Sequence, residues 1–205
     1  MNILAVSPVK RVSIDAVVLR ENGFREDLGC IAFWDKSLLK RMDWRIKRMR
    51  GNGLYLVTPD PVAGIIGLLS LPFLATFMVN AGEAITTNRI HGAGTEPLNV
   101  GWGTGAGTTA KTDTTLFTEV AVDGTGSGAR TAGTGSQVTT TNTNDTYQVT
   151  ATRTSTDASP LAITNAGTWD NVTIGSGNLY MKGDFGTITL SSGDSIAFTC
   201  KVQYV

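Results

Sequence analysis

Residues 97–205 consist of short stretches rich in Thr, Val and Ile, each separated from the next by Gly, Asn, Asp or Ser. β-Branched residues favour the extended backbone of strands, whereas Gly, Asn and Asp supply the tight turns between strands. The stretches recur about every ten residues, a spacing that is typical of sandwiches and jelly rolls. The pattern therefore predicts an all-β domain over this half of the chain.

Nine strands are predicted there: 98–102, 116–122, 137–141, 147–154, 162–165, 171–174, 179–182, 187–190 and 196–205. The last one alternates most regularly, because Ile196, Phe198, Cys200, Val202 and Tyr204 fall on one face. That face is expected to pack into a core, while the other contacts water. The fold class that follows is mainly β, with a β-sandwich or jelly-roll C-terminal domain over residues 80–205 and a partly helical N-terminal arm over residues 1–79.

Two helices are predicted before the β-rich half. Within residues 35–50, apolar residues recur at helical spacing and leave the basic residues on the other faces, which indicates a cationic amphipathic helix ended by a Gly-Asn-Gly turn. Within residues 80–90, Asn80 is expected to cap a short helix whose Ile85 faces inward.

Charge is distributed unevenly along the chain. Residues 1–50 hold 11 Lys and Arg against 6 Asp and Glu, whereas the remaining residues hold 6 against 11. A basic arm joined to an acidic domain is typical of binding to an acidic surface, or of an arm that associates with its own domain. The alternative is that these charges only solvate the surface of the helix.

The most hydrophobic stretch is Val62–Val79, whose 18 residues include two glycines and Pro72. Its length is at the lower limit for crossing a bilayer and basic residues precede it, so a membrane anchor is one interpretation. Because Pro72 and the glycines weaken a helix, a hydrophobic arm that is buried or packed at an interface is preferred. A third interpretation places the start of translation at Met78, so that the preceding residues are not made.

Residues suited to catalysis are sparse in the β-rich half. Segment 105–112 approaches a phosphate-binding loop, but Ala110 replaces the final glycine and a strand is predicted after it, so a turn is preferred. The single histidine, His91, stands in a glycine-rich turn without a companion motif, and the aspartates stand beside Gly, Thr or Asn, as turn residues do. Cys30 and Cys200 lack metal-ligand spacing, and Cys200 is expected to be buried. We therefore predict no enzyme activity and no catalytic, cofactor-binding or metal-binding residue.

Several short motifs follow one another in a fixed order between residues 78 and 205. They are a GTG turn in 101–109, a DTxLxxE stretch in 113–119, an I-x-N-x-G stretch in 163–167 and a GD hairpin in 177–185. In this order the motifs resemble those of a group of tailed-bacteriophage virion proteins, for which capsid-decoration and tail or fibre roles are both plausible. The resemblance implies a non-enzymatic part of the virion and leaves open which part. Residues 1–77 depart from the pattern.

The preferred hypothesis is a capsid cement, or decoration, protein that sits on the shell as a homotrimer and bridges neighbouring capsomers. Its expected partners are the major capsid protein and its own copies, with no nucleic acid, membrane or cofactor, and it would pass from the host cytoplasm into the virion. The residues predicted to contact the capsid or sister subunits are Trp34, Leu38, Trp44, Arg45, Lys47, Arg48, Arg50, Phe73 and Phe77. The alternatives are a tail, neck or receptor-binding fibre protein whose loop at 124–136 touches a host glycan and, in a different class, a membrane-anchored β-domain protein.

Overall fold

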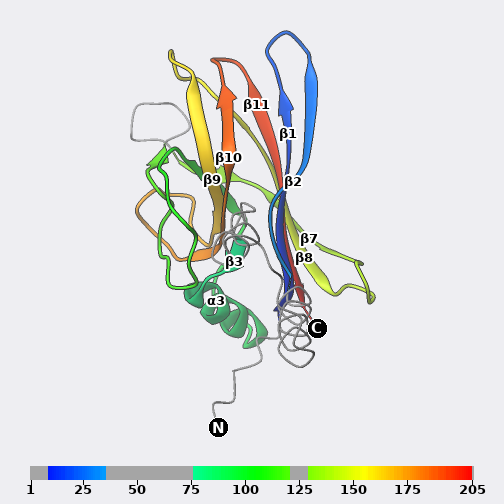
Figure 1. The fold of residues 1–205 in the computed structure, drawn as a ribbon. Helices are drawn as coiled ribbons and strands as arrows, with labels where there is room; N and C mark the ends of the chain where they lie inside the picture. Colours follow the sequence, from blue (N-terminus) through cyan, green and yellow to red (C-terminus); the bar gives the residue numbers. More distant parts are fainter. Residues whose placement is uncertain (1–8, 36–75, 121–128, 205) are drawn as a thin grey trace, which may run out of the picture. The chain divides into compact units, whose positions relative to one another are not determined.

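The computed structural model describes residues 9–35, 76–120 and 129–204. Two antiparallel β-sheets face each other in this part of the chain, and one short helix lies across one end of them (Figure 1). The predicted fold class, mainly β with a sandwich architecture, is confirmed.

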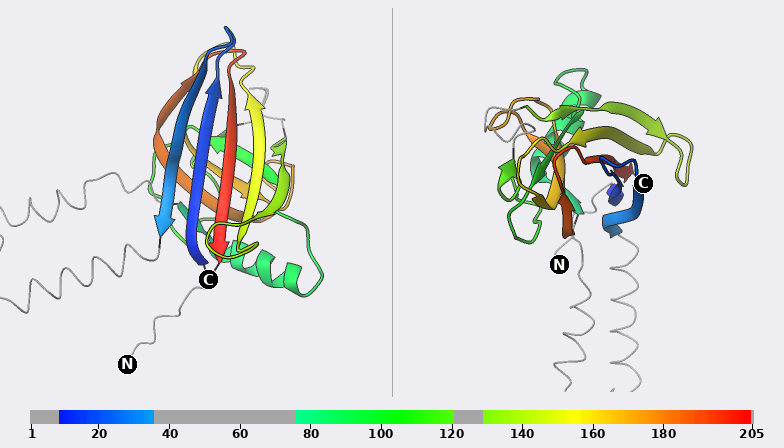
Figure 2. Two further views of the ribbon diagram at one scale, coloured as in Figure 1. Left: turned by 90° about the vertical axis from the view of Figure 1, so that its right-hand side faces the viewer. Right: turned by 90° about the horizontal axis from the view of Figure 1, so that it is seen from above.

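The first sheet has five strands in the order β2-β1-β11-β8-β7 (Figure 2). Its strands are β1 (Val9–Leu19), β2 (Arg25–Asp35), β7 (Thr134–Val138), β8 (Thr146–Thr154) and β11 (Ser195–Tyr204). The predicted alternation along β11 is confirmed, because Ile196, Phe198, Cys200 and Val202 are buried and Tyr204 is partly buried against the same core. This face of the sheet therefore turns toward the other sheet.

The second sheet has six strands. In spatial order they are β3 (Thr76–Met78), β10 (Leu179–Leu190), β9 (Leu161–Trp169), β4 (Asn99–Gly103) and β5 (Glu119–Val120), and β6 (Thr131–Ala132) also pairs with β4. The two predicted strands 179–182 and 187–190 are one strand, β10. The turn-like residues between them are accommodated by a register shift between Asp184 and Ile188, as in a β-bulge.

Apolar side chains from the inner faces of the two sheets form the main core, in which Ile14, Trp102 and Phe198 are almost completely buried. A second, smaller cluster is built around Val79, Leu116, Trp169 and Leu179. The six-stranded sheet is therefore covered on both faces, by the other sheet on one and by a loop on the other.

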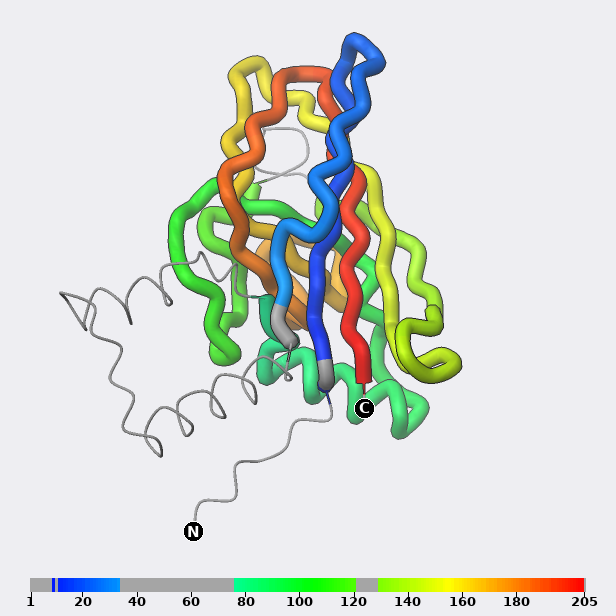
Figure 3. Tube along the Cα trace, turned by 45° about the vertical axis from the view of Figure 1, so that its right-hand side comes forward, coloured from blue at the N-terminus to red at the C-terminus, as the bar shows by residue number. Residues whose placement is uncertain are grey.

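The β1–β2 hairpin belongs to the sandwich, so the predicted boundary between an arm at 1–79 and a domain at 80–205 is wrong. β1 lies between β2 and β11 and pairs with β11 along its length, with Ile14 opposite Cys200 (Figure 3). Met1–Trp34 and Leu74–Val205 form one compact unit, and Asp35–Phe73 falls outside it. A chain that began at Met78 would lack β1 and β2 and would leave the edge of β11 without a partner.

The helix α3 (Asn80–Ile90) is where the sequence predicts it, and Ile85 is buried as expected. Its N-cap, however, is Val79 rather than Asn80, and no side chain caps this end. Asn80 lies instead in the first turn, with its backbone N–H donating to Lys111 O at 2.9 Å.

Further loop and strand predictions differ from the structure. Segment 171–174 is not a strand, because its backbone carbonyls turn toward a buried arginine. In the described part of 116–122, only Glu119–Val120 is extended. The described part of the expected loop at 124–136 holds β6 and the start of β7, since its small residues pair with β4 and β8.

The predicted basic helix at 35–50 and residues 62–75 of the hydrophobic segment lie outside the described residues. The described end of that segment is a strand, because β3 pairs with β10, with Met78 opposite Met181. In the described ranges, no helix is long and apolar enough to cross a membrane.

Residues 36–75 connect β2 to β3 in the sequence. A Cβ added at Gly183 would lie 2.5 Å from Thr76 Oγ1 and 3.0 Å from Ala32 Cβ. Ala32 of β2 and Thr76 of β3 therefore both lie next to Gly183 of β10.

Candidate functional site

Every second residue of Gly101–Gly107 is a glycine, and we call these four glycines, of which the first two lie in β4, the glycine track. The chain returns over this track with residues 113–119, which we call the covering segment. A Cβ added at Gly105 would lie 2.6 Å from Thr118 Oγ1 and 2.9 Å from Phe117 O. Side chains on the track would push the covering segment away, so the glycines serve close packing.

Asn165 on β9 holds the covering segment in place. Its fully buried Oδ1 accepts a hydrogen bond from Phe117 N at 3.1 Å, and its Nδ2 donates to Phe117 O at 3.1 Å and Gly105 O at 3.2 Å. One amide thus binds backbone groups of both the covering segment and the glycine track. Two residues along, a Cβ at Gly167 would lie 3.4 Å from Leu116 Cδ2, so the I-x-N-x-G motif is the part of β9 that receives the covering segment.

Lys182 on β10 is fully buried beneath the covering segment. Its Nζ lies 2.8 Å from Asp113 Oδ2 and 3.1 Å from the centroid of the Phe117 ring. Burial lowers the pKa of Lys182, and the carboxylates of Asp113 and Asp184 oppose this shift. Asp184, two residues further along the same strand, accepts a hydrogen bond from Thr109 N at 2.9 Å. The GD motif therefore meets the loop that carries the DTxLxxE motif.

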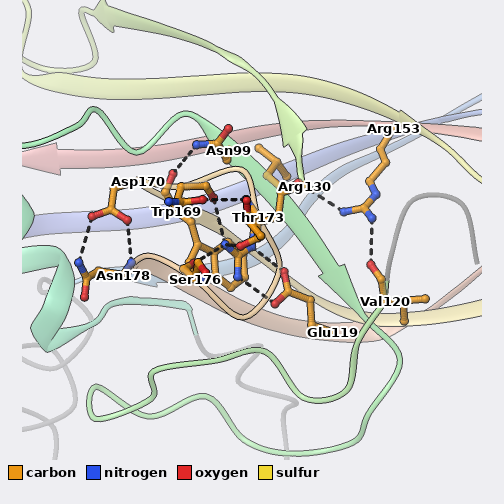
Figure 4. A network of polar contacts seen from close by, with 12 residues as sticks. Asn99, Glu119, Val120, Arg130, Arg153, Trp169, Asp170, Thr173, Ser176 and Asn178 are labelled. Carbon is orange, nitrogen blue, oxygen red and sulfur yellow. Dashed lines mark hydrogen bonds and ion pairs between the residues drawn. The ribbon is translucent and has the colours of Figure 1, made fainter. Parts of the chain in front are cut away.

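Arg130 is buried at the other end of the covering segment (Figure 4). Its guanidinium binds the Glu119 carboxylate twice, with Nε–Oε1 at 2.7 Å and Nη2–Oε2 at 3.1 Å. Its Nη1 donates to three backbone carbonyls of the turn 171–176 at 2.8–3.0 Å. The guanidinium also lies 4.0 Å from the centroid of the Trp169 ring, a cation–π contact. We call this arrangement the Arg130 clamp.

The four motifs of the sequence thus meet in one packed unit on the outer face of the six-stranded sheet, which we call the outer-face cluster. Its members are the glycine track, the covering segment, Asn165, Gly167, Lys182, Asp184 and the Arg130 clamp. Asp113 and Glu119, the acidic residues of the DTxLxxE motif, are each paired with a buried cation. The arrangement neutralises its own charges and fixes a long loop against the sheet.

Sequence reasoning missed Arg130 and a second buried arginine, Arg153. Arg153 on β8 lies 4.4 Å from the centroid of the Trp102 ring and donates to Val120 O at 2.9 Å. A signal for Arg153 was present, because it falls on the same face of β8 as the buried Val149. No comparable signal marked Arg130, which follows a glycine-rich stretch.

Of the residues predicted to contact a capsid, the two in the described part of the chain, Trp34 and Phe77, are not members of the outer-face cluster. Phe77 is half-buried in β3, opposite Lys182 on β10. The backbone of Trp34 belongs to β2. The others lie outside the described residues: Leu38, Trp44, Arg45, Lys47, Arg48, Arg50 and Phe73.

Aspartates at turns act as the sequence predicts. The Asp145 carboxylate accepts hydrogen bonds from the three N–H groups of 140–142 at 2.9–3.0 Å, and Asp194 accepts from two turn N–H groups at 2.9 Å. His91 is exposed at the C-terminal end of α3, and Cys200 is buried as expected.

Among the surface depressions of the described part of the chain, one of about 100 Å³ lies between α3 and the loop at 170–178. Another, of about 120 Å³, lies beside Arg11, Asp15 and Lys201 on the five-stranded sheet. Both are smaller than the roughly 300–1,000 Å³ that is typical of ligand pockets. Among the residues in 9–35, 76–120 and 129–204, no group of three His, Cys, Asp or Glu side chains is placed to hold a metal ion.

No protein-family model matches this chain, and no curated protein or solved structure matches it. Its function is therefore inferred from the ordered motifs and from the geometry of the sandwich.

Proposed function

We propose that this chain is a non-enzymatic structural protein of a bacteriophage virion, specifically a capsid cement protein that bridges neighbouring capsomers. The observation that carries the proposal is that the four ordered motifs meet in the outer-face cluster. Their acids, amide and glycines each serve the packing of one loop, as expected of a part that must be rigid. Activity then resides in the surfaces that the sandwich presents to its neighbours.

Segment 36–75 is the surface that we assign to binding. It is inserted between β2 and β3, the edge strands of the two sheets, a place where a sandwich tolerates additions without losing its core. The segment contains seven of the nine predicted contact residues, including the basic Arg45, Lys47, Arg48 and Arg50. Apolar burial, at about 25 cal/mol per Å², would supply affinity, while the basic residues would orient the chain on acidic capsid surface.

The partners that we propose are the major capsid protein and further copies of this chain, arranged as a homotrimer at local three-fold positions. Bridging would be mechanical, because it spreads the internal pressure of packed DNA over more buried interface.

A loop-replacement variant tests the proposal. Residues 36–75 are replaced by a short Gly/Ser linker, and binding to purified, DNA-filled, tailless heads of the phage that carries this chain is measured by co-sedimentation. The variant should keep the circular dichroism of the sandwich and lose head binding. Deleting residues 1–77 instead would remove β1, β2 and most of β3, so that it would test folding rather than binding.

A matched control distinguishes loss of binding from general damage. Lys111→Ala changes an exposed basic residue of the sandwich and should bind heads as the unmodified chain does. Head binding at full strength by the loop-replacement variant would contradict the role of segment 36–75. Failure of the unmodified chain to bind heads would contradict the cement assignment itself and favour the tail, neck or fibre alternative.

A further inference from the structure

Among the lysine ion pairs of the described residues, the pair formed by Lys182 and Asp113 is the most buried. The Lys182 side chain is 1% exposed, the Asp113 side chain is 20% exposed, and their Nζ and Oδ2 atoms are 2.8 Å apart. The Phe117 ring lies on the lysine nitrogen at 3.1 Å and separates it from solvent. A primary amine is thus held in a dry site against a carboxyl group from a loop that is far away in the sequence.

We propose that Lys182 and Asp113 condense to an intramolecular isopeptide bond that ties the covering segment covalently to β10. In this step the Lys182 Nζ forms a bond to Asp113 Cγ, and the bond from Cγ to Oδ1 breaks. The ammonium gives up two of its three protons, and both leave with Oδ1 as one molecule of water. The product is a neutral amide, so no oxidant, reductant or co-reactant is required.

The geometry brings the reacting atoms together. A nitrogen at hydrogen-bond distance from a carboxyl oxygen is close to the carboxyl carbon, and near-attack arrangements place reacting atoms about 3–3.5 Å apart. The Ala110 N–H donates to the same Oδ2 at 3.1 Å, so it is placed to stabilise the negative charge that develops on this oxygen during attack. The partial exposure of Asp113 gives the released water a way out.

The surroundings also favour the neutral amine that attacks. Burial disfavours the ammonium form and lowers the pKa of Lys182, although the Asp113 carboxylate opposes this shift. Asp184 lies two residues from Lys182 on the same face of β10, and its charge acts on that lysine.

Two exposed pairs of the same chain provide an internal comparison. Lys111 contacts Glu83 with side chains 47% and 39% exposed, and Lys201 contacts Asp15 with side chains 34% and 31% exposed. Water stabilises the charged forms of these pairs, so neither should condense. The inference does not depend on the virion assignment, although a covalent tie would suit a part under mechanical load.

The test is the intact mass of the full chain after purification and denaturation. The expected mass is lower than the sequence mass by one water molecule. After cleavage with trypsin, residues 112–130 and 154–201 should remain joined as one branched peptide, because a modified Lys182 is no longer cut. A chain at its full sequence mass would overturn the proposal. Loss of water that maps to a succinimide within one peptide, without the branched product, would overturn it as well.

Two variants locate the bond. Lys182→Arg keeps the cation and Asp113→Ala removes the carboxyl group, and each should restore the full sequence mass. A variant that still lost one water would show that the bond involves other residues. Lys111→Arg, at the exposed pair, is the matched control and should lose one water as the unmodified chain does.

Discussion

Replacing Arg130 by methionine should destabilise the fold far more than breaking an exposed ion pair. Methionine retains much of the apolar stem but removes the donors that bind Glu119 and the three carbonyls of the turn 171–176. The Glu119 side chain is 10% exposed, so its carboxylate would be left buried without a partner.

The expected cost can be estimated from these contacts. Removing one partner of a buried pair costs about 3–5 kcal/mol, and the freed carbonyls add to this only in part because the turn can admit water. We expect a loss of about 4–6 kcal/mol in the free energy of unfolding, a large share of the about 5–15 kcal/mol that is usual for a domain. In a domain of this size the melting temperature should fall by about 10–20 °C.

Urea unfolding followed by tryptophan fluorescence measures this change, because Trp169 lies directly against the guanidinium. Lys111→Met is the control, since it breaks the exposed pair with Glu83 and should cost about 0–1 kcal/mol. The double variant Arg130→Met with Glu119→Leu should recover part of the loss, because no buried charge remains unpaired. An Arg130→Met chain within about 1 kcal/mol of the Lys111→Met control would refute the importance assigned to the clamp.

Three further outcomes are expected. Gly103→Ala should lower the free energy of unfolding by about 1–3 kcal/mol, because the added Cβ would meet the covering segment. Gly186 has open space around it, so Gly186→Ala should change the free energy of unfolding by less than about 1 kcal/mol. Equal effects of the two substitutions would contradict the packing role of Gly103. The pKa of Asp194 is held below its ordinary value: partial desolvation raises it, but hydrogen bonds from turn N–H groups and from Arg20 lower it by more. The carboxylate therefore stabilises the fold above about pH 4, and this stabilisation is lost as the pH falls toward the folded-state pKa. Asp194→Asn should therefore flatten the acid limb of stability between about pH 5 and 3, and an unchanged limb in urea titrations would argue against this role. Burial raises the pKa of Cys200 to about 12, whereas Cys30 is exposed. Iodoacetamide should therefore label Cys30 alone in the folded chain and label Cys200 as well after unfolding, as measured by mass spectrometry. Rapid labelling of Cys200 in the folded chain would contradict its burial.

The features of the fold that depend on local pattern could be predicted from the sequence. The alternation of Ile196, Phe198 and Cys200 correctly predicts β11 and its buried face. The pattern of residues 80–90 correctly predicts the helix α3. These predictions succeed because side-chain period and turn residues act within a few positions of each other.

The N-terminal hairpin was missed because its evidence is not local. Residues 14–19 are a short, mostly apolar stretch, but β1 becomes a central strand only through β11, where Ile14 is opposite Cys200. β2 is obscured by its charged first residues and by Gly29, which has a φ of 60° and interrupts the alternation. Pairing between distant segments is not contained in either segment alone.

The outer-face cluster was predictable in its parts but not in its arrangement. The alternate glycines of 101–107 have the period of a strand face, which indicates that another segment lies on them. What the sequence does not reveal is that Lys182 would be buried there with Asp113, since an isolated lysine is normally expected in water.

The pairing of β1 with β11 also sets the time at which this protein can finish folding. Asp15 and its ionic partner Lys201 are 186 positions apart, and a ribosome adds about 5–20 residues per second. The β1–β2 hairpin must therefore wait about 10–40 s on the nascent chain before the strand that completes its sheet is synthesised. During this interval one edge of β1 is open to pairing with other chains, so synthesis in the cell should depend on chaperones more than the size of the protein suggests.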